Sequence, residues 1–420
     1  MAAADALPNP RMTTGAIPYV ERFLIAATWQ RLNTCMQSPI NVAVLGATGS
    51  IGRSALEGIQ ADPTLRAYGL SGHTQTQLLA RQARAVNAAK VVVTDPARAA
   101  DLSPVDLPPN TEVLVGEEGV RQLVTSPEVN VVLAAIVGSA GLLGTWAAIE
   151  AGKTVALANK ESLVMAGDLV MRLARERGAR ILPVDSEHSA IFQCMQAGQR
   201  AEVRRIVLTA SGGPFRKTPL DQLAHVTVEQ ALAHPTWDMG AKITVDSATM
   251  MNKALEIIEA RWLFDLKPEQ IAVVVHPQST VHSFVEFVDG SVVAQLGPPD
   301  MRLPIQYALT YPHRRPGVAA EVDWFRPWAL EFEPPDPERF PALGLGMEVA
   351  AAGGTSGAVL NAANEAAVAG FLAGQLKFTE IVPTCRRVLE HHDYDPHPTL
   401  ERLLELDRWA RAEVTRWVSN

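Results

Sequence analysis

With 420 residues, of which 47% are hydrophobic and 20% charged, the chain has the composition of a globular protein of about two to four domains, which excludes a largely disordered, collagen-like or coiled-coil protein. Lys and Arg number 37 against 45 Asp and Glu, so the net charge of −8 gives no global attraction for nucleic acid, and any anion must bind at a local site. The cysteines Cys35, Cys194 and Cys385 form no CxxC pair, which argues against a disulfide framework or a cysteine-based zinc site and fits a reducing cytoplasm.

Residues 1–37 are expected to be a disordered extension outside the fold. They lack the charged start, apolar core and small-residue cleavage site of a signal peptide, and they carry few basic residues for a transit peptide. Translation that begins at Met36 is an alternative that the sequence leaves open. The longest early apolar run, Phe23 to Trp29, is far shorter than the roughly 18 residues of a membrane span, so no membrane crossing is expected.

From residue 38 to residue 184, apolar runs alternate with helical patterns. This βαβ rhythm predicts an α/β fold with a Rossmann-like, doubly wound parallel sheet. The predicted strands are INVAVL, AYGL, KVVV, VVLAAIV, TVALA and RILPV. The predicted helices are Ile51–Gln60, Gln75–Asn87, Leu142–Ala151 and Leu163–Arg177.

Residues 185–310 predict a second domain of the α+β class. Its strands are RRIVLTA, IAVVV, VHSFVEFV and SVVAQL, and the last two flank Asp289-Gly290, which predicts a hairpin. One helical stretch runs from Ala248 to Phe264.

The remaining chain divides into a linker and a bundle. Residues 311–338 are rich in proline and predict a long extended linker. Residues 339–420 are mostly helical and predict a small C-terminal bundle. Its periodic segments are Gly357–Leu372, Phe378–Leu389 and Leu400–Val418.

The first motif with chemistry is Gly46-Ala47-Thr48-Gly49-Ser50-Ile51-Gly52, between the first strand and a helix. Glycines let the backbone turn sharply and approach a pyrophosphate, while a helix N-terminus offers unpaired N–H groups. The GxxGxxG spacing is a variant dinucleotide fingerprint, and Gly46 and Gly49 are therefore candidate cofactor contacts. A tight turn without a ligand is the alternative.

An NAD site usually has Asp or Glu about 20 residues further on, at the end of the second strand. Here that place holds Ser71-Gly72-His73-Thr74. Because no carboxylate repels a 2′-phosphate, NADPH is favoured over NADH. Gly72, His73 and Thr74 are then candidate contacts, with His73 as the candidate cation near the strand end.

Asp185-Ser186-Glu187-His188 follows the strand RILPV, at the edge of the sheet where doubly wound folds bind ligands. Two carboxylates at i and i+2 share one face of an extended segment, so both could reach one metal ion. Helix capping is the alternative role for these acidic residues.

The stretch from Asp246 to Glu256 predicts a helix start with polar groups inside an apolar pattern. Asn252, Lys253 and Glu256 project from nearly one face, and Ser247 is placed at the helix N-terminus, where a phosphate would bind. A solvated helix face is the alternative, although the flanking positions are Met and Leu rather than alternating charges.

Two loops complete the set of motifs. Thr209 to Phe215 contains a Ser-Gly-Gly turn that could cradle an anion, and a plain turn is nearly as good an interpretation. His234 to Gly240 carries Trp237 between Pro and Gly, as either a buried anchor or a mobile lid.

Long strings in chain order resemble the 1-deoxy-D-xylulose 5-phosphate reductoisomerase family from about residue 40 to the C-terminal bundle. These strings are GATGSIG, AAIVGSAGL, LANKESLV, PVDSEHSAIFQ, ASGGPF, HPTWDMG, KITVDSATMMNKALEIIEARWLF, HPQST, LGPPDMR and LNAANE. The resemblance implies an NADP-dependent oxidoreductase that converts 1-deoxy-D-xylulose 5-phosphate to 2-C-methyl-D-erythritol 4-phosphate in the non-mevalonate route to isoprenoids. It also implies NADPH, one Mg²⁺ or Mn²⁺ ion, a cytoplasmic homodimer, and a sugar phosphate as the small-molecule partner.

The resemblance also implies residue roles. Asp185, Glu187 and Glu256 would bind the metal, and Lys160 and Ser186 would contact the substrate near its reacting carbons. The substrate phosphate would be bound by Ser211, Ser247, Asn252 and Lys253. His234 and Trp237 would belong to a flap over the substrate, His234 counting among the catalytic residues. The cofactor would be lined by Thr48, Gly49, Ser50, Ile51, Asn159, Glu161, Met239 and Gly240.

The sequence departs from the family pattern at four positions. A basic residue and Asn are usual where His73 and Thr74 stand, which puts the 2′-phosphate contact and the strength of NADP preference in doubt. Ser189 replaces a common Asn and Ala254 a common Gly, and neither is a ligand in the motif.

The residues themselves favour metal-assisted chemistry. Three carboxylates without His or Cys make an all-oxygen site that suits Mg²⁺ or Mn²⁺ better than zinc.

Two alternative functions remain open. Another NADP-dependent oxidoreductase, such as a semialdehyde dehydrogenase, needs a nucleophilic cysteine, for which Cys194 in a predicted helix is a poor candidate. A non-catalytic nucleotide sensor would need the glycine turn but not the three carboxylates.

Overall fold

The computed structural model describes residues 38–237, 239–325 and 327–418, so the prediction for residues 1–37 lies outside the described residues. The larger sheet has seven parallel strands in the order β4-β3-β2-β1-β5-β6-β7, which confirms the predicted doubly wound α/β fold. The strands are β1 Ile40–Leu45, β2 Leu65–Gly72, β3 Lys90–Val93, β4 Glu112–Val115, β5 Val131–Ala134, β6 Thr154–Leu157 and β7 Arg180–Pro183.

Helices cover both faces of this sheet, because successive strand residues point to opposite sides. Val42 and Val44 of β1 pack in one core with α2 and α3, and Ala43 and Leu45 pack in the opposite core with α4, α5 and α6. The helices are α2 Ser50–Ala61, α3 Thr76–Val86, α4 Gly116–Thr125, α5 Leu142–Glu150 and α6 Glu161–Arg177. The sequence patterns had not predicted β4 and α4.

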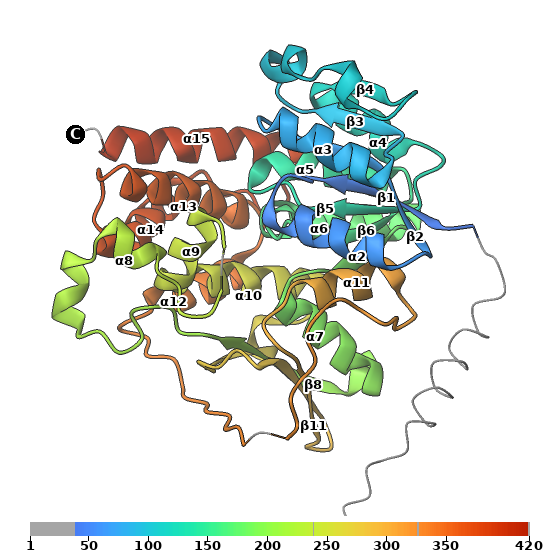
Figure 1. The fold of residues 1–420 in the computed structure, drawn as a ribbon. Helices are drawn as coiled ribbons and strands as arrows, with labels where there is room; N and C mark the ends of the chain where they lie inside the picture. The colour runs from blue at the N-terminus through green and yellow to red at the C-terminus, as the bar shows by residue number, and fades with distance from the viewer. Residues whose placement is uncertain (1–37, 238, 326, 419–420) are drawn as a thin grey trace, which may run out of the picture. The chain divides into compact units, whose positions relative to one another are not determined.

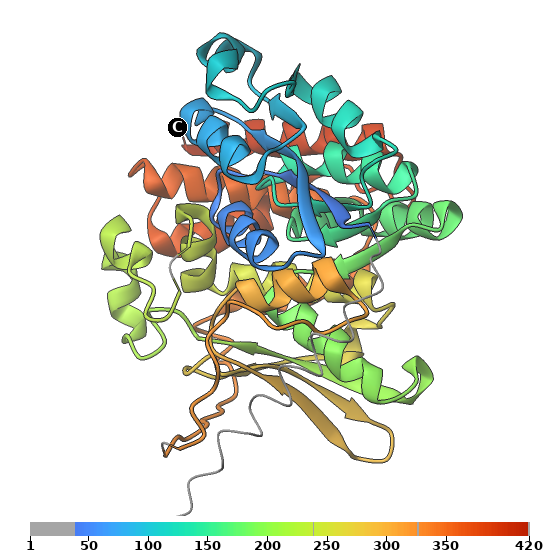
Figure 2. The same ribbon diagram turned by 45° about the vertical axis from the view of Figure 1, so that its right-hand side comes forward.

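The smaller sheet is mixed, with the order β11-β10-β8-β9. β8 (Val203–Ala210) is parallel to β9 (Ile271–Val275) and antiparallel to β10 (Val281–Phe287), and β10 forms the predicted hairpin with β11 (Val292–Leu296). α7 (Ser186–Cys194) packs on β10 and β11. α11 (Arg302–Thr310) lies between the two sheets and packs against α2 and α7, as Figure 2 shows in orange.

The C-terminal helices share a core with the central part of the chain. α13 packs on α14, on α15 and on α6 of the larger-sheet layer (Figure 1). Buried residues of β8, of α10 (Met251–Leu263) and of α13 belong to one continuous hydrophobic cluster. The bounds are α12 Pro341–Ala352, α13 Ser356–Leu372, α14 Ile381–His391 and α15 Leu400–Val418. Short 3₁₀ helices lie at Pro96–Asp101, Pro104–Asp106, Ser139–Gly141, Met195–Ala197, Arg200–Glu202, Leu220–His225, Pro268–Gln270 and Phe378–Glu380.

The predicted helix from Ala248 to Phe264 is wrong as a single element. Met250 has a φ of +60°, so the chain forms α9 (Ala241–Thr249) and then α10 (Met251–Leu263). A left-handed Met is costly by itself, but its side chain is 2% exposed and packs with Ala210 and Phe340. Tertiary packing therefore stabilises a break for which the sequence has no Gly or Pro signal.

Two glycines of α12 offer a matched test of the contact between α12 and α10. A Cβ on Gly346 would lie 2.7 Å from Cα of Ala254, whereas a Cβ on exposed Gly344 meets nothing within 4 Å. Gly346→Ala should therefore destabilise the protein by about 2 kcal/mol through overpacking. Gly344→Ala should stabilise it by about 0.5 kcal/mol, because alanine loses less backbone entropy in a helix. Urea unfolding of both variants measures this, and equal effects would contradict the close approach of the two helices.

Candidate active site

A cavity of about 580 Å³ opens beside the C-terminal ends of β5, β6 and β7. In the strand order, the neighbours of β1 on its two sides are β2 and β5, and this change of direction is where doubly wound sheets bind ligands. The wall also includes the start of α2, the end of β8, the loop before α9, and parts of α9 and α10. The structure thus brings motifs from the larger-sheet domain and motifs from the following α+β part of the chain to one cavity.

Three carboxylates converge at this cavity, of which Asp185 and Glu187 line it and Glu256 is fully buried. Oxygen atoms of Asp185, Glu187 and Glu256 lie within 4.8 Å of one another. The predicted extended geometry of the first two is wrong, because α7 begins at Ser186. Asp185 at the N-cap and Glu187 in the first turn nevertheless project from the same helix end. Asp185 makes no capping hydrogen bond, which excludes the capping alternative for its carboxylate.

Two lysines link these carboxylates. Lys160 Nζ lies 2.5 Å from Asp185 Oδ2 and 3.2 Å from Glu256 Oε1. Lys253 Nζ lies 2.7 Å from Glu187 Oε1 and also contacts Glu256 Oε2. Asn252 adds an amide that donates to Glu256 Oε1. Three negative charges facing two ammonium groups leave one negative charge, so a divalent cation fits this all-oxygen donor set.

The electrostatics of the cluster are set by burial and mutual pairing. Burial opposes ionisation of Asp185, but the Lys160 ammonium outweighs it and holds the pKa of Asp185 well below its usual range. Burial, together with the neighbouring Glu256 carboxylate, raises the pKa of Glu187. Burial disfavours the charge on Lys160, yet Asp185 and Glu256 raise its pKa well above the usual value. The ammonium of Lys160 therefore stays charged at neutral pH.

His188 links α7, which carries Asp185 and Glu187 at its start, to α10, which carries Glu256. Its Nε2 lies 3.0 Å from the backbone oxygen of Glu256, and its Nδ1 lies 3.1 Å from Glu259 Oε2. Burial lowers the pKa of His188, but the facing Glu259 carboxylate outweighs burial and raises it to about 9. The charged ring donates from Nε2 to Glu256 O and forms an ion pair with Glu259 on its Nδ1 side, and both contacts hold α7 against α10.

The predicted phosphate residues line the same cavity. Ser211, Ser247, Asn252 and Lys253 all contribute to its wall. Ser247 lies in the last turn of α9 and not at a helix N-terminus, which corrects the prediction, because the chain breaks at Met250. Asn252 and Lys253 instead occupy the first turn of α10. Ser186, also in the wall, donates to Glu187 Oε2 at 2.6 Å.

The loop between α8 (Val228–Leu232) and α9 places His234 and Trp237 over the cavity. His234 Nδ1 accepts the N–H groups of Thr236 and Trp237 at 3.1 and 2.9 Å. The ring proton is therefore on Nε2, which lies 3.1 Å from Ser211 Oγ. Burial lowers the pKa of His234, so the ring is neutral and donates to Ser211.

The glycine turn fits a dinucleotide. Gly46 has a φ of +78°, and a Cβ there would lie 2.5 Å from the backbone oxygen of Ala135. A Cβ on Gly49 would meet only Gly46 O, at 3.4 Å, so the outer side of the turn is open. No side chain caps α2 at Gly49, which leaves the N–H groups of the first turn for an anion. Ser50 and Ile51 of that turn line the cavity.

Some of the other predicted cofactor residues line the cavity, and the rest lie at the end of β2. Those that line the cavity are Asn159, Glu161, Met239 and Gly240. Gly72, His73 and Thr74 stand at the end of β2 and do not line it. Glu161 Oε1 pairs with Lys242 Nζ at 3.1 Å, which links the start of α6 to α9.

Several wall residues were not singled out as site residues. Ser279 and His282, from the turn before β10 and from β10 itself, line the cavity, as do Pro299 and Met301. The strings HPQST and LGPPDMR, already quoted for the resemblance, were the available signal. Lys242 and Asp246 also belong to the wall and pair at 3.0 Å.

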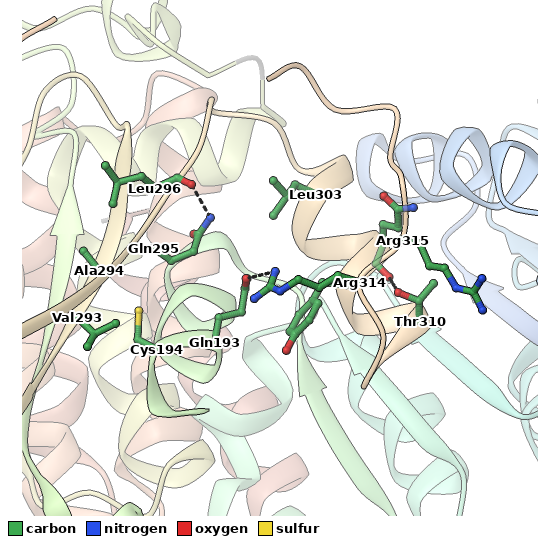
Figure 3. A pocket seen from close by; sticks show the side chains of 12 residues that line it. Gln193, Cys194, Val293, Ala294, Gln295, Leu296, Leu303, Thr310, Arg314 and Arg315 are labelled. Atoms are coloured by element: carbon green, nitrogen blue, oxygen red, sulfur yellow. Dashed lines mark hydrogen bonds between the residues drawn. The ribbon is translucent and has the colours of Figure 1, made fainter. Parts of the chain in front are cut away.

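A second cavity of about 460 Å³ lies between α7, β11 and α11. Figure 3 shows Cys194 and Gln193 on one side of it and Arg314, which bonds to Gln193 at 2.9 Å, on the other. Burial raises the pKa of Cys194 to about 11. Cys194 is thus a protonated thiol outside the carboxylate cavity, which removes the nucleophile needed for the semialdehyde dehydrogenase alternative.

The comparison with known proteins agrees with this geometry. The model of the 1-deoxy-D-xylulose 5-phosphate reductoisomerase family matches residues 42–167, and models of its C-terminal domains match residues 181–264 and 296–413. The 1-deoxy-D-xylulose 5-phosphate reductoisomerase of Rhodopirellula baltica is 50% identical over 89% of this chain and 94% of its own length. The chain belongs to the 1-deoxy-D-xylulose 5-phosphate reductoisomerase family.

Further relatives support membership in the reductoisomerase family. The enzyme of Pseudomonas fluorescens is 50% identical over 91% of this chain and 99% of its own. The reductoisomerase of Zymomonas mobilis, solved in complex with NADPH, has a TM-score of 0.85 at 45% identity and covers 91% of this chain and 99% of its own. Another, solved with NADPH, fosmidomycin and magnesium, has a TM-score of 0.85 at 42% identity and covers 90% of this chain and 98% of its own. Among the residues described in our structure, no helix is long and apolar enough to cross a bilayer.

Metal binding tests the carboxylate cluster of this reductoisomerase-family protein. Glu256→Gln should weaken Mn²⁺ binding at least about tenfold, because it removes the charge of a fully buried carboxylate that lies close to the other two. Electron paramagnetic resonance of free Mn²⁺ during titration measures the affinity. The control is Glu348→Gln. Glu348 is an exposed residue of α12 that pairs with Arg386, and this variant should bind Mn²⁺ like the wild type. Equal affinity in the two variants would rule out Glu256 as a ligand.

Proposed function

We propose that this protein converts 1-deoxy-D-xylulose 5-phosphate to 2-C-methyl-D-erythritol 4-phosphate with NADPH and one divalent cation, Mg²⁺ or Mn²⁺, in isoprenoid biosynthesis. The observation that carries the proposal is the cavity lined by Asp185 and Glu187 of the three-carboxylate cluster, by the start of α10 and by the first residues of α2 after the glycine turn. A nucleotide sensor would need the glycine turn alone, so the buried carboxylate cluster favours an enzyme.

Asp185, Glu187 and Glu256 would hold the cation. When bound, the cation supplies Lewis-acid stabilisation of negative charge on adjacent substrate oxygens. Lys160 and Lys253 now pair with these carboxylates. A cation that takes over the carboxylates would leave both ammonium groups to donate to substrate: Lys160 to oxygens near the reacting carbons, and Lys253 to the phosphate.

NADPH would supply the hydride that reduces the aldehyde formed by rearrangement. Ser50 and Ile51 at the start of α2 would bind its pyrophosphate through backbone N–H groups. Met239 and Gly240, which also line the cavity, would lie against the nicotinamide. Asn159 is held by its donation to Gly138 O at 3.0 Å, which keeps that side of the cofactor wall rigid.

The substrate phosphate would be bound away from the reacting carbons by Ser211, Ser247, Asn252 and Lys253. Binding energy from this remote group orients the reacting part and so contributes to the rate. The neutral His234 ring already orients Ser211. Closure of the Trp237 loop would exclude water from the site.

We also propose a cytoplasmic homodimer. Cys194 and Cys385 are buried free thiols, as expected in a reducing compartment. β11 is an edge strand, and Val288 and Val292 of its hairpin are 65% and 58% exposed, so a second subunit could cover this edge. Sedimentation equilibrium of the purified protein distinguishes one chain from two.

NADPH oxidation by the purified protein tests the proposed reaction. With 1-deoxy-D-xylulose 5-phosphate and Mg²⁺ or Mn²⁺, absorbance at the NADPH band should fall, because the cation and the cofactor act in one cavity. EDTA should abolish the reaction and added metal should restore it. A folded protein that binds NADPH but does not oxidise it under these conditions would contradict the proposal.

Substrate kinetics test the phosphate residues. Ser247→Ala should raise the KM for the substrate about tenfold with a smaller change in kcat, because a hydrogen bond to a charged group contributes roughly 1.5 to 3 kcal/mol. Ser103→Ala, outside the cavity, is the matched control and should leave the KM unchanged. If both variants have the wild-type KM, Ser247 does not bind the phosphate.

A further inference from the structure

Two of the strings quoted for the family resemblance, AAIVGSAGL and LNAANE, contain none of the residues with a proposed role. The first includes residues 135–139, which follow β5 and are called the post-β5 segment below, and the second lies on α13. Ile136 and Val137 of the post-β5 segment line the cavity. The glycine turn lies against the start of the segment, since a Cβ on Gly46 would be 2.5 Å from the backbone oxygen of Ala135. The post-β5 segment is therefore cavity wall beside the proposed pyrophosphate site.

Glu365 of α13 lies directly against the post-β5 segment. Gly138 has a φ of +73°, and a Cβ there would lie 2.9 Å from Glu365 Oε1 and 3.1 Å from Oε2. The backbone oxygen of Gly138 accepts from Asn159 Nδ2 at 3.0 Å, and the same amide donates to Glu161 Oε2 at 2.9 Å. Glu365 thus occupies the space that a side chain at position 138 would need, next to the peptide that orients two predicted cofactor residues.

Arg411 of α15 binds both Glu365 and the post-β5 segment. Its guanidinium donates to the two carboxylate oxygens of Asp407 at 2.9 Å each, which fixes its plane. Nη2 also donates to Glu365 Oε2 at 2.7 Å and to Ser139 Oγ at 3.1 Å. Asn361 Nδ2 donates to the other oxygen of Glu365, Oε1, at 3.0 Å. A planar group with several donors can serve all these acceptors, whereas the single ammonium of a lysine could not.

The pair of Glu365 and Arg411 is mostly shielded from water. Their side chains are 16% and 32% exposed. An exposed ion pair fixes little, but a shielded pair with further hydrogen bonds constrains the groups around it. The carboxylate also acts on the cavity wall, because burial lowers the pKa of Lys242 while Asp246, Glu161 and Glu365 together raise it above its usual value.

We propose that Glu365 and Arg411 are positioning residues of the cofactor site, which hold the post-β5 segment from the C-terminal bundle in the conformation that binds NADPH. This inference rests on the proposed use of NADPH. The alternative role is a clamp between α13 and α15 that only stabilises the bundle. The two roles differ in their consequence, since only positioning predicts that loss of the contact with Ser139 weakens NADPH binding.

Fluorescence titration of the metal-free, full-length protein with NADPH tests the proposal without turnover. Arg411→Met should raise the Kd for NADPH about tenfold, because the post-β5 segment loses its contact with α15. Ser139→Ala should raise this Kd less, because it removes one hydrogen bond and leaves Glu365 in place. The double variant should have the same Kd as Arg411→Met, because Ser139 and Arg411 act through one shared contact.

Two controls separate positioning from a general loss of stability. Val414→Ala removes methyl groups from the core that α15 shares with α13, so it should lower the melting temperature. Its Kd for NADPH should nevertheless stay within about twofold of the wild type, because its site is distant from the post-β5 contact. Arg411→Met should bind Mn²⁺ like the wild type in the electron paramagnetic resonance titration, because the side-chain contacts of Arg411 are with Asp407, Glu365 and Ser139.

Three results would overturn the proposal: a wild-type Kd for NADPH in Arg411→Met, additive effects of Arg411→Met and Ser139→Ala, or a Kd raised equally by Val414→Ala. If Arg411→Met does not fold, Ser139→Ala decides, since a raised Kd supports positioning and an unchanged Kd refutes it. All of these results leave the proposed function intact, because the wild type would still bind NADPH. If the folded wild type did not bind NADPH, the proposed function would fail, and the inference with it.

Discussion

The pairing of buried carboxylates with buried lysines organises this site. Glu256 is fully buried and contacts Lys160, Lys253 and Asn252, while Asp185 and Glu187 are held by the same two lysines. An isolated charge in such a place costs several kcal/mol, so removing any one member leaves another without compensation. The cluster therefore has a defined geometry, and its one excess negative charge is what makes it receptive to a divalent cation.

This geometry depends on helices that come from different parts of the fold. α7 follows the last strand of the larger sheet, whereas α10 packs between the smaller sheet and the C-terminal helices. His188 joins α7 to α10, and Asn364 of α13 donates to Asp246 of α9 at 2.8 Å. The C-terminal bundle thus holds the helices that carry the site in place, through a shared hydrophobic core and this hydrogen bond.

The glycine turn beside this cavity is built differently, mainly from backbone. The turn at Gly46 and the uncapped start of α2 offer N–H groups and little side-chain charge. The strand end at Gly72, His73 and Thr74 lies outside the carboxylate cavity. His73 takes part in none of the buried ion pairs of that cavity.

The sequence by itself determined most strands and helices of the larger-sheet layer, the hairpin of β10 and β11, and most of the motifs from which the cavity is built. These follow from short-range patterns: apolar runs such as KVVV, the Asp289-Gly290 turn, and the glycines after β1. Tertiary structure alone decided the break at Met250, where packing against Ala210 and Phe340 overrides local preference, and it moved Ser247 from a predicted helix start to a helix end. It also decided the pairing of Lys160 with Asp185 and of Lys253 with Glu187, and the place of Ser279 and His282 in the wall. Such contacts join residues far apart in the chain, and no local pattern encodes the distance between them.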